Sequence, residues 1–388
     1  MILYTSLNAV GKFDGEKIEK LDSGYINKYR DTLIRIRQNN EWKYSGQSAY
    51  FQGRGRRQDL GDEPVEFASA VNAACSDGDE GIIYTAIAGE VSGVIAKNYE
   101  TGRENHIYHS NKYEFFSAQN CLDAGLIFLS AAEKAYSKSV AVYNRNTNDL
   151  RFLTSGEAID DNPFYDAASG AVYYDSKGLG MSSRMEIVSV GAASIFKTNP
   201  EGTFCDEVLS ERGYDLLCPK IDNAGNLYYI KRPYKTGAKK GGGNLFLDII
   251  LLPFRLVANI IKGLIYLSKI GAKKKGRKNV NTFGDNPSVQ QELSDYDLFV
   301  YGEQLNAAKE EKVNSKKDKT AGFAPKSYEL FRIKPGGDKQ LVRRGVLSYD
   351  IDPSGALYYS NGRYVFKAGD ADDKVVFKDK LIFNIKAY

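Results

Sequence analysis

Hydrophobic and polar positions alternate in short runs along most of the chain, and turns containing Asp and Gly separate the runs, which predicts many short β-strands. The pattern is clearest in PFYDAASGAVYYDS (163–176), CPKIDNAGNLYYIK (218–231) and SYDIDPSGALYYSN (348–361). Each copy predicts a strand, a turn in which Asp accepts amide hydrogen bonds and Gly takes positive φ, and a strand with paired aromatic residues. Looser copies occupy residues 74–87 and 118–131.

The turn glycines of these copies repeat at a nearly constant interval. At positions 81, 125, 170, 225 and 355 they are 44, 45, 55 and 130 residues apart. Removing roughly 85 residues from the last interval restores a period of about 45, which is typical of a four-stranded β-propeller blade. The content of Tyr (27), Phe (19) and Gly (37) also favours strands joined by tight turns. We therefore expect an all-β fold, a seven-bladed β-propeller, with six blades as the alternative.

The two ends of the chain predict how the ring of blades closes. Residues 1–8 resemble the second strand of a blade, and residues 381–388 would supply its missing first strand. Residues 24–55 are interpreted as a degenerate blade. The predicted organisation is propeller blades over 1–234, an insertion over 235–325, and completion of the propeller over 326–388.

Two short motifs resemble known propeller families. The Asp-turn-Gly-aromatic units resemble the WD40-like propellers of the TolB type, although the WD dipeptide is absent. The segment LVRRGVLSYDIDPSG resembles the Arg-Arg-Gly motif of phosphoinositide-binding propellers at Arg343, Arg344 and Gly345. This second resemblance implies that Arg343 and Arg344 are candidate anion-binding residues, although here the insertion precedes the arginine pair.

Residues 245–272, LFLDIILLPFRLVANIIKGLIYLSKIGA, predict a long amphipathic helix inside the insertion. Its charged residues fall every seven positions, at Asp248, Arg255, Lys262 and Lys269, and draw one narrow polar stripe along an apolar cylinder. Pro253 would kink this helix or begin its first turn. The candidate membrane- or partner-binding residues are Leu245, Phe246, Ile249, Leu252, Phe254, Leu256, Ile260, Leu264, Leu267, Arg255, Lys262, Lys269, Lys273, Lys274, Lys275, Arg277 and Lys278.

The charge of the chain is concentrated around this segment. Residues 231–278 hold thirteen Lys or Arg against one acid, whereas the rest of the chain holds 40 bases and 48 acids. A basic, apolar segment on a mildly acidic body is typical of attachment to an anionic membrane surface. Packing of the segment on a partner protein or on the propeller itself is the alternative. A single membrane span is disfavoured, because both flanks belong to one blade.

Catalytic and metal-binding patterns are not found in the sequence. His106 and His109 lie three positions apart on a predicted strand and would point to opposite faces, which makes a poor metal pair. Asp166, Asp222, Asp350 and Asp352 are interpreted as residues that cap their own blade turns. The motif Gly-x-Ser-x-Gly and phosphate-binding loops are absent, so we expect no catalytic residues, no metal, no cofactor, no small-molecule substrate and no nucleic acid partner.

Cys75, Cys121, Cys205 and Cys218 are widely spaced, which favours reduced core thiols in a cytoplasmic protein. A signal peptide is not visible at residues 1–6. We expect a non-catalytic propeller scaffold, cytoplasmic and peripheral at the inner face of a membrane, with protein partners. The alternatives are an obligate subunit whose inserted helix docks in a partner groove, and a ligand binder or enzyme at the channel mouth.

Overall fold

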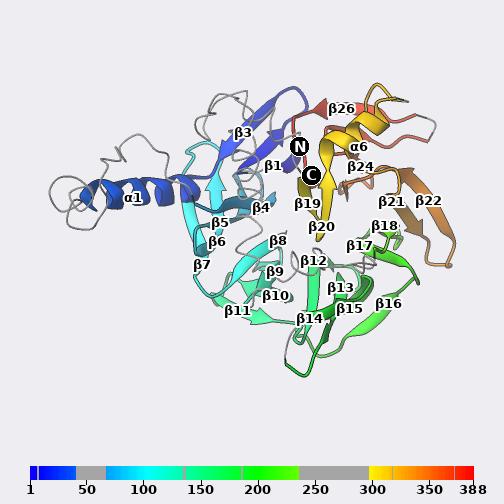
Figure 1. Ribbon diagram of the computed structural model, residues 1–388, viewed down its shortest axis with the longest axis horizontal. Coiled ribbons are helices and arrows are strands. Elements are labelled where there is room, and N and C mark those ends of the chain that lie inside the picture. Colours follow the sequence, from blue (N-terminus) through cyan, green and yellow to red (C-terminus); the bar gives the residue numbers. More distant parts are fainter. Residues whose placement is uncertain are drawn as a thin grey trace, which may run out of the picture.

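The predicted repeat units fold into four-stranded antiparallel sheets arranged in a ring (Figure 1). The computed structural model describes residues 1–6, 8–40, 67–133, 137–184, 187–235, 297–316, 318–370 and 372–388. These residues form six such sheets, so the protein is a six-bladed β-propeller. The prediction of seven blades is wrong, and the alternative of six is confirmed.

Each blade is given from its innermost strand outward. Blade one is β27 (Ile385–Ala387), β1 (Ile2–Ser6), β2 (Ala9–Phe13) and β3 (Ile18–Asp22). Blade two is β4 (Ser69–Ser76), β5 (Gly81–Ala88), β6 (Val91–Asn98) and β7 (Glu104–Ser110). Blade three is β8 (Glu114–Cys121), β9 (Leu126–Ala132), β10 (Ser139–Asn144) and β11 (Asp149–Phe152).

Blade four is β12 (Ala158–Asp166), β13 (Ala171–Met181), β15 (Ser194–Thr198) and β16 (Asp206–Leu209), and β14 (Ile187–Val190) pairs with the end of β13. Blade five is β17 (Tyr214–Ile221), β18 (Leu227–Pro233), β21 (Glu329–Ile333) and β22 (Lys339–Arg344). Blade six is β23 (Ser348–Ile351), β24 (Leu357–Ser360), β25 (Tyr364–Lys367) and β26 (Lys374–Lys378).

The ring closes between the two ends of the described chain. Strand β1 pairs with β27, so that Leu3 lies opposite Lys386 and Tyr4 opposite Ile385. The prediction that the C-terminal residues supply the first strand of this blade is confirmed. The paired tyrosines also behave as expected, because Tyr229 is buried against Ile195 of the preceding blade, and Tyr228 packs with Tyr349 of the following one.

The insertion interrupts blade five between its second and third strands. Strands β18 and β21 pair directly, with Lys231 opposite Glu329, although some ninety-five residues separate the two strands in the sequence. In the described end of the insertion, β19 (Asp297–Val300) and β20 (Glu303–Asn306) form a separate two-stranded hairpin. Its apolar residues Leu298, Val300 and Leu305 enter the core of the neighbouring blades.

Helix α6 (Ala307–Asn314) follows this hairpin and is rich in charged residues. The Asn306 side chain caps the helix by accepting from the Lys309 amide at 2.8 Å. Ala307 and Asn314 are buried, and the Asn314 amide donates to the carbonyls of Gly322 and Ala324. Local capping and these buried contacts explain why this charged segment is ordered.

Helix α1 (Gly24–Asn40) occupies most of the segment that was interpreted as a degenerate blade, so that interpretation is wrong for residues 24–40. Ser23 accepts a hydrogen bond from the Ile26 amide at 3.2 Å and caps the helix. Tyr25, Ile26 and Tyr29 pack on blade two. The approach is close, because a Cβ added at Gly89 would lie 2.1 Å from Tyr29 Oη.

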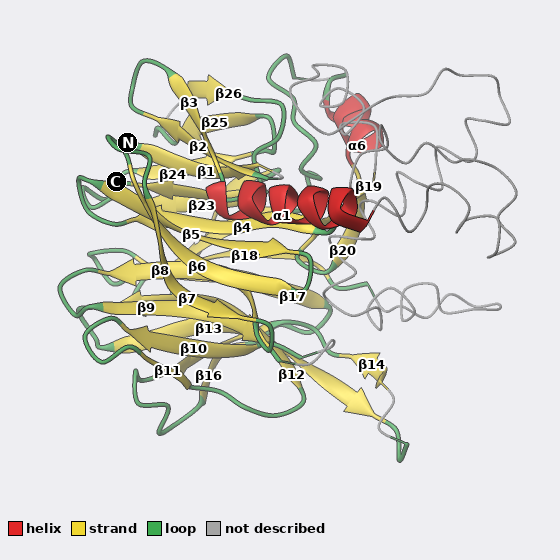
Figure 2. Ribbon diagram, turned by 90° about the vertical axis from the view of Figure 1, so that its left-hand side faces the viewer, coloured by secondary structure: helices red, strands yellow, loops and turns green. Residues whose placement is uncertain are grey.

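The described ends of the three most elaborate connections lie on one side of the propeller. In a blade, the loop between the second and third strands and the connection to the next blade leave from the same side. Helix α1, the β13–β14 extension and the described part of the insertion (β19, β20 and α6) therefore share one face, here called the insertion face. Figure 2 shows α6, β19, β20 and β14 away from the two termini, which lie on the opposite side with the short Asp-Gly turns. That opposite side is the turn face.

Candidate functional site

The base of the insertion is fixed to the propeller by one buried arginine. Arg232, near the end of β18, is 3% exposed. Its guanidinium donates to Asp215 Oδ2 at 2.9 Å, to Tyr328 Oη at 3.0 Å and to the Tyr301 carbonyl at 2.9 Å, and it lies 3.2 Å from Glu303 Oε2. Two acids and two tyrosines therefore converge on a single cation, which locks the β19–β20 hairpin onto blade five.

A second buried cation contacts the same hairpin from blade four. Lys177 donates to the Tyr301 carbonyl at 3.1 Å and lies 3.9 Å from Asp215 Oδ2. Burial, reinforced by the neighbouring charge of Arg232, lowers the pKa of Lys177. Tyr301 itself takes a left-handed conformation with φ of 52°, which is unusual for an aromatic residue and is maintained by these contacts. We call Lys177, Asp215, Arg232, Tyr301 and Glu303 the clamp.

Lys235 extends the clamp to the edge of the described chain. It forms an ion pair with Glu303, so residues on both sides of segment 236–296 contact each other. Lys231 forms an ion pair with Glu211, which lies in the connection between β16 and β17. Of the thirteen bases in 231–278, Lys231, Arg232 and Lys235 thus form ion pairs with acids of the described structure. Ten remain between 236 and 278, against Asp248 alone.

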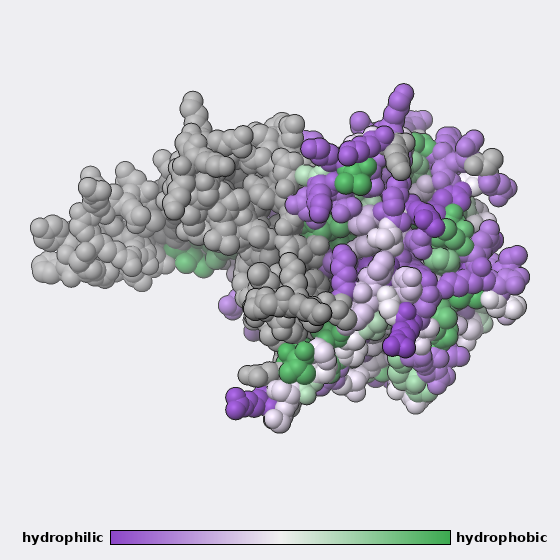
Figure 3. Space-filling view, turned by 45° about the vertical axis from the view of Figure 1, so that its right-hand side comes forward, coloured by the Kyte–Doolittle hydropathy of each residue, from purple (hydrophilic) through white to green (hydrophobic). Residues whose placement is uncertain are grey.

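The predicted helix 245–272 and the basic residues 273–278 lie outside the described residues. Their roles stay predictions. None of the helices in the described part of the chain is long and apolar enough to cross a membrane. On the side seen in Figure 3, the described surface is mostly hydrophilic, and hydrophobic residues form small separate patches.

The predicted anion-binding arginines already have acidic neighbours. Arg343 donates to both carboxylate oxygens of Asp373, at 2.8 and 2.7 Å, and to the Gly369 carbonyl at 2.5 Å. The more exposed Arg344 lies 3.3 Å from Glu329. A phosphate at Arg343 would have to compete with Asp373 for the guanidinium.

Three of the four candidate acids cap their own turns, as expected. Asp166, Asp222 and Asp352 each accept hydrogen bonds from amides two to four residues later. Asp350 does not belong to this group, because it is buried in β23 rather than placed in a turn. It accepts from Lys220 at 2.5 Å and thereby joins blades five and six.

The two histidines lie on the same face, contrary to the prediction. The register of β6 and β7 shifts between Val94 and Ile95, so Ile107 is an extra residue in the strand. This bulge turns His106 and His109 to the same side, with ring centroids 6.2 Å apart, and both meet the edge of Tyr25. In the described residues, no group of three or more His, Cys, Asp or Glu is placed to hold a metal ion.

The cysteines are free thiols in the described structure. Cys75 and Cys218 are buried, as predicted for core thiols, and burial raises the pKa of Cys75 to about 12. Cys121 is partly buried, and Cys205 is exposed and lies 3.0 Å from Tyr174 Oη. The prediction of core thiols therefore fails for Cys205.

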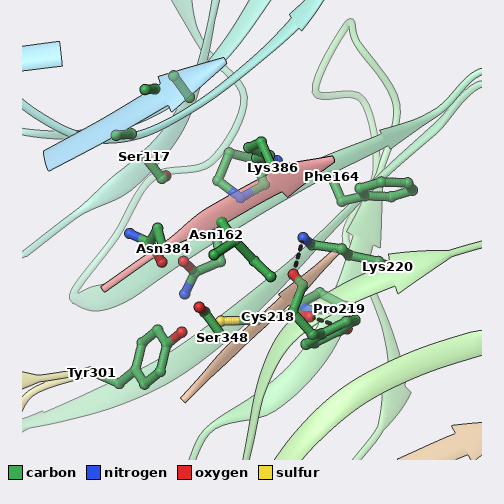
Figure 4. Close-up of a pocket in the computed structure, with 16 residues that line it drawn as sticks. Ser117, Asn162, Phe164, Cys218, Pro219, Lys220, Tyr301, Ser348, Asn384 and Lys386 are labelled. Carbon is green, nitrogen blue, oxygen red and sulfur yellow. Dashed lines mark hydrogen bonds between the residues drawn. The ribbon is translucent and has the colours of Figure 1, made fainter. Parts of the chain in front are cut away.

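The innermost strands of all six blades surround a central cavity of about 60 Å³, shown in Figure 4. Its polar lining comes from Ser117, Asn162, Cys218, Lys220, Tyr301, Ser348, Asn384 and Lys386. Tyr301 joins this lining to the clamp, since its hydroxyl donates to the Leu347 carbonyl at 2.9 Å.

Two residues of this lining, Asn162 and Cys218, have left-handed backbones with φ of 52° and 55°. Each lies at an irregularity in the innermost strand of its blade. The carboxylate of Asp175 fixes both, because its Oδ2 accepts from Asn162 Nδ2 and from the Cys218 amide, each at 2.8 Å. Burial, with the Asp161 charge, raises the pKa of Asp175 to about 7.

The described residues thus define a six-bladed β-propeller with one elaborated face and a central cavity whose lining is mixed, with polar groups set among apolar ones. No protein-family model matches the chain, and no curated protein matches it. Solved structures of similar fold include a chain of the nidogen/laminin complex, at 8% identity over 99% of this chain and 96% of that chain, with a TM-score of 0.49. TolB from Acinetobacter baumannii matches at 10% identity over 100% of this chain and 66% of that chain, with a TM-score of 0.49.

The tricorn protease matches at 11% identity over 97% of this chain and 33% of that chain, with a TM-score of 0.45. These identities are low, so the likeness concerns the fold alone. The propeller implied by the resemblance to TolB-type repeats is confirmed, and it rests on the six blades themselves.

Proposed function

We propose that this protein is a non-catalytic propeller scaffold that attaches to an anionic membrane surface at the inner, cytoplasmic face of a membrane. Attachment is through the amphipathic segment 245–272 and the basic residues 273–278, and the remaining propeller surface binds protein partners. The observation that supports the proposal most is the anchoring of the insertion at one point. Lys235 before segment 236–296 and Glu303 after it form an ion pair beside the buried Arg232.

This anchoring favours a segment that lies on a membrane over one that crosses it once. The chain leaves blade five at β18 and returns to the clamp on the same insertion face. A single crossing would place the two ends of the segment on opposite sides of a bilayer. An amphipathic helix in the interfacial plane leaves both ends on one side.

The positive charge of the segment that is proposed to contact the membrane is large. Residues 236–278 contain ten Lys or Arg and one acid. The three bases that precede them, Lys231, Arg232 and Lys235, are paired with acids of the described structure and are not counted. Each Lys or Arg held near an anionic surface contributes about 1 kcal/mol. Burial of the apolar face adds about 25 cal/mol per Å². Two such signals together suffice for stable but reversible attachment.

Co-sedimentation with vesicles tests the proposal on the full chain. The vesicles contain phosphatidylcholine alone or phosphatidylcholine with about 30% phosphatidylserine. The second composition gives the vesicles a negative surface charge like that of an anionic membrane leaflet. Wild type is compared with a deletion of 241–278 and with the triple variant Lys273→Gln, Lys274→Gln, Lys275→Gln. The matched control replaces Lys17, Lys334 and Lys374 by Gln, because Lys17 and Lys334 are exposed in turns of the turn face and Lys374 is exposed at the start of β26 on the same face.

We expect wild type and the control to sediment with anionic vesicles only. The triple variant should bind at least tenfold more weakly, and the deletion should remain in solution. Thermal unfolding of each variant checks that the propeller is intact. Equal sedimentation of wild type and the deletion would refute membrane attachment through this segment. A wild type that ignores lipid would instead favour docking of the segment on a partner protein.

A further inference from the structure

The central cavity contains hydroxyl groups that the described chain leaves without hydrogen-bond partners. Ser348, on the innermost strand of blade six, is 4% exposed, and its Oγ has no partner among the described residues. The same holds for the buried Oγ of Ser117, on the innermost strand of blade three. Buried hydroxyls in proteins are nearly always hydrogen-bonded. Both serines line the cavity in Figure 4 and are donors that lack an acceptor.

The cavity also carries an uncompensated positive charge. Lys386 lies on β27 between Ile385 and Ala387, which are buried in blade one, so its own side chain points to the channel. No carboxylate of the described residues forms an ion pair with it. The second lysine of the lining, Lys220, is neutralised by Asp350 at 2.5 Å. The lining is therefore cationic by one charge.

Nearby acids do not remove this surplus. The second oxygen of Asp350 accepts from the Ala387 amide at 2.7 Å, so both carboxylate oxygens are engaged. Asp175 is not among the residues that line the cavity, and its Oδ2 already accepts from Asn162 and Cys218. The surplus charge and the free donors therefore face the same space.

We propose that the central cavity is a binding site for a small oxyanion, either inorganic phosphate or a short carboxylate. Lys386 supplies the opposite charge, and Ser117 and Ser348 donate hydrogen bonds to the anionic oxygens. A cavity of about 60 Å³ holds roughly four water molecules, which corresponds to one anion of this size. The left-handed Asn162 and Cys218 in the lining fit a binding role, because strained backbones cluster at ligand sites.

Isothermal titration calorimetry with sodium phosphate, and separately with sodium acetate, tests the site at constant ionic strength in sodium chloride. The variants are Lys386→Gln and Ser348→Ala, and Lys374→Gln on an exposed outer strand is the matched control. Loss of a charged hydrogen-bond partner weakens binding by about tenfold or more, and loss of a neutral one by a few-fold. The control should bind as wild type does. Phosphate and acetate titrations distinguish the two kinds of oxyanion.

Ser348→Ala separates a binding role from a structural one. Because the hydroxyl has no partner within the described chain, its removal should leave the thermal unfolding temperature without anion unchanged or higher, while the anion affinity falls. The variant therefore stays informative if Lys386→Gln fails to fold. Absence of binding by wild type to both anions would overturn the proposal. So would equal affinity in wild type and in Ser348→Ala.

Discussion

Replacing Asp175 by Asn should make the stability of the propeller less dependent on pH. Asp175 is 3% exposed, and one of its oxygens accepts from both Asn162 and Cys218. An Asn carbonyl at that position can accept the same two hydrogen bonds. The substitution therefore removes only the ability to ionise. It tests whether this carboxyl is neutral in the folded protein at mildly acidic pH.

The direction of this pH dependence follows from the raised pKa of Asp175. Burial, followed by the Asp161 charge, raises the pKa of Asp175 from 3.8 to about 7 in the folded state. Between these values the unfolded chain loses its proton while the folded protein keeps it, so stability falls as pH rises. The loss is about 1.4 kcal/mol per pH unit and is complete above the folded pKa. Between pH 5 and pH 8, Asp175 should therefore lower the free energy of unfolding by about 3 kcal/mol.

Urea unfolding at pH 5 and pH 8, monitored by far-ultraviolet circular dichroism, measures the contribution of Asp175 to the free energy of unfolding. The difference in free energy of unfolding between Asp175→Asn and wild type should shift in favour of the variant by about 3 kcal/mol across that range. Titrating groups that do not interact with Asp175 cancel in this comparison. Asp166→Asn, at the end of β12 where the turn to β13 begins, is the control. A difference between Asp175→Asn and wild type that is the same at both pH values would refute the reasoning.

Two further substitutions test the clamp and the turns by urea unfolding. Arg232→Met leaves Asp215 and Glu303 buried without their shared cation, so it should lower the free energy of unfolding by about 3–5 kcal/mol; a loss below 1 kcal/mol would show that the clamp is not formed. Asp222→Ala removes a side chain that accepts three hydrogen bonds in its turn and should destabilise by about 1–2 kcal/mol, whereas Asp222→Asn should change little. Equal losses in both Asp222 variants would contradict turn capping.

The blades could be predicted from sequence because their signal is local. In the turns at Asp222 and Asp352, the carboxylate accepts amides within four residues, and Gly225 and Gly355 take φ of 77° and 87°. Such a turn therefore has the same sequence pattern in every copy of the repeat. The number of blades was overestimated because α1 replaces the expected strands, and its Tyr25, Ile26 and Tyr29 belong to a helical pattern.

The site could be predicted only in part, because its contacts join distant residues. Arg232 and Glu303 meet across 71 positions of sequence, and nothing local to either residue marks the pair. The bulge that turns His106 and His109 to one face depends on how β7 pairs with β6. A signal did exist in β27, where the polar Lys386 alternates with buried apolar residues on a strand that was predicted to be innermost.

Tyr301 connects the two proposals, because it belongs to the clamp and also lines the cavity. The experiments nevertheless separate them. Deletion of 241–278 leaves Arg232, Lys235 and Glu303 in place, so anion affinity should survive it. Lys386→Gln leaves the basic segment intact, so vesicle binding should survive that change. If the deletion weakened anion binding, the effect would reach the cavity through the hairpin that carries Tyr301 or through β18, which pairs with the cavity-lining β17.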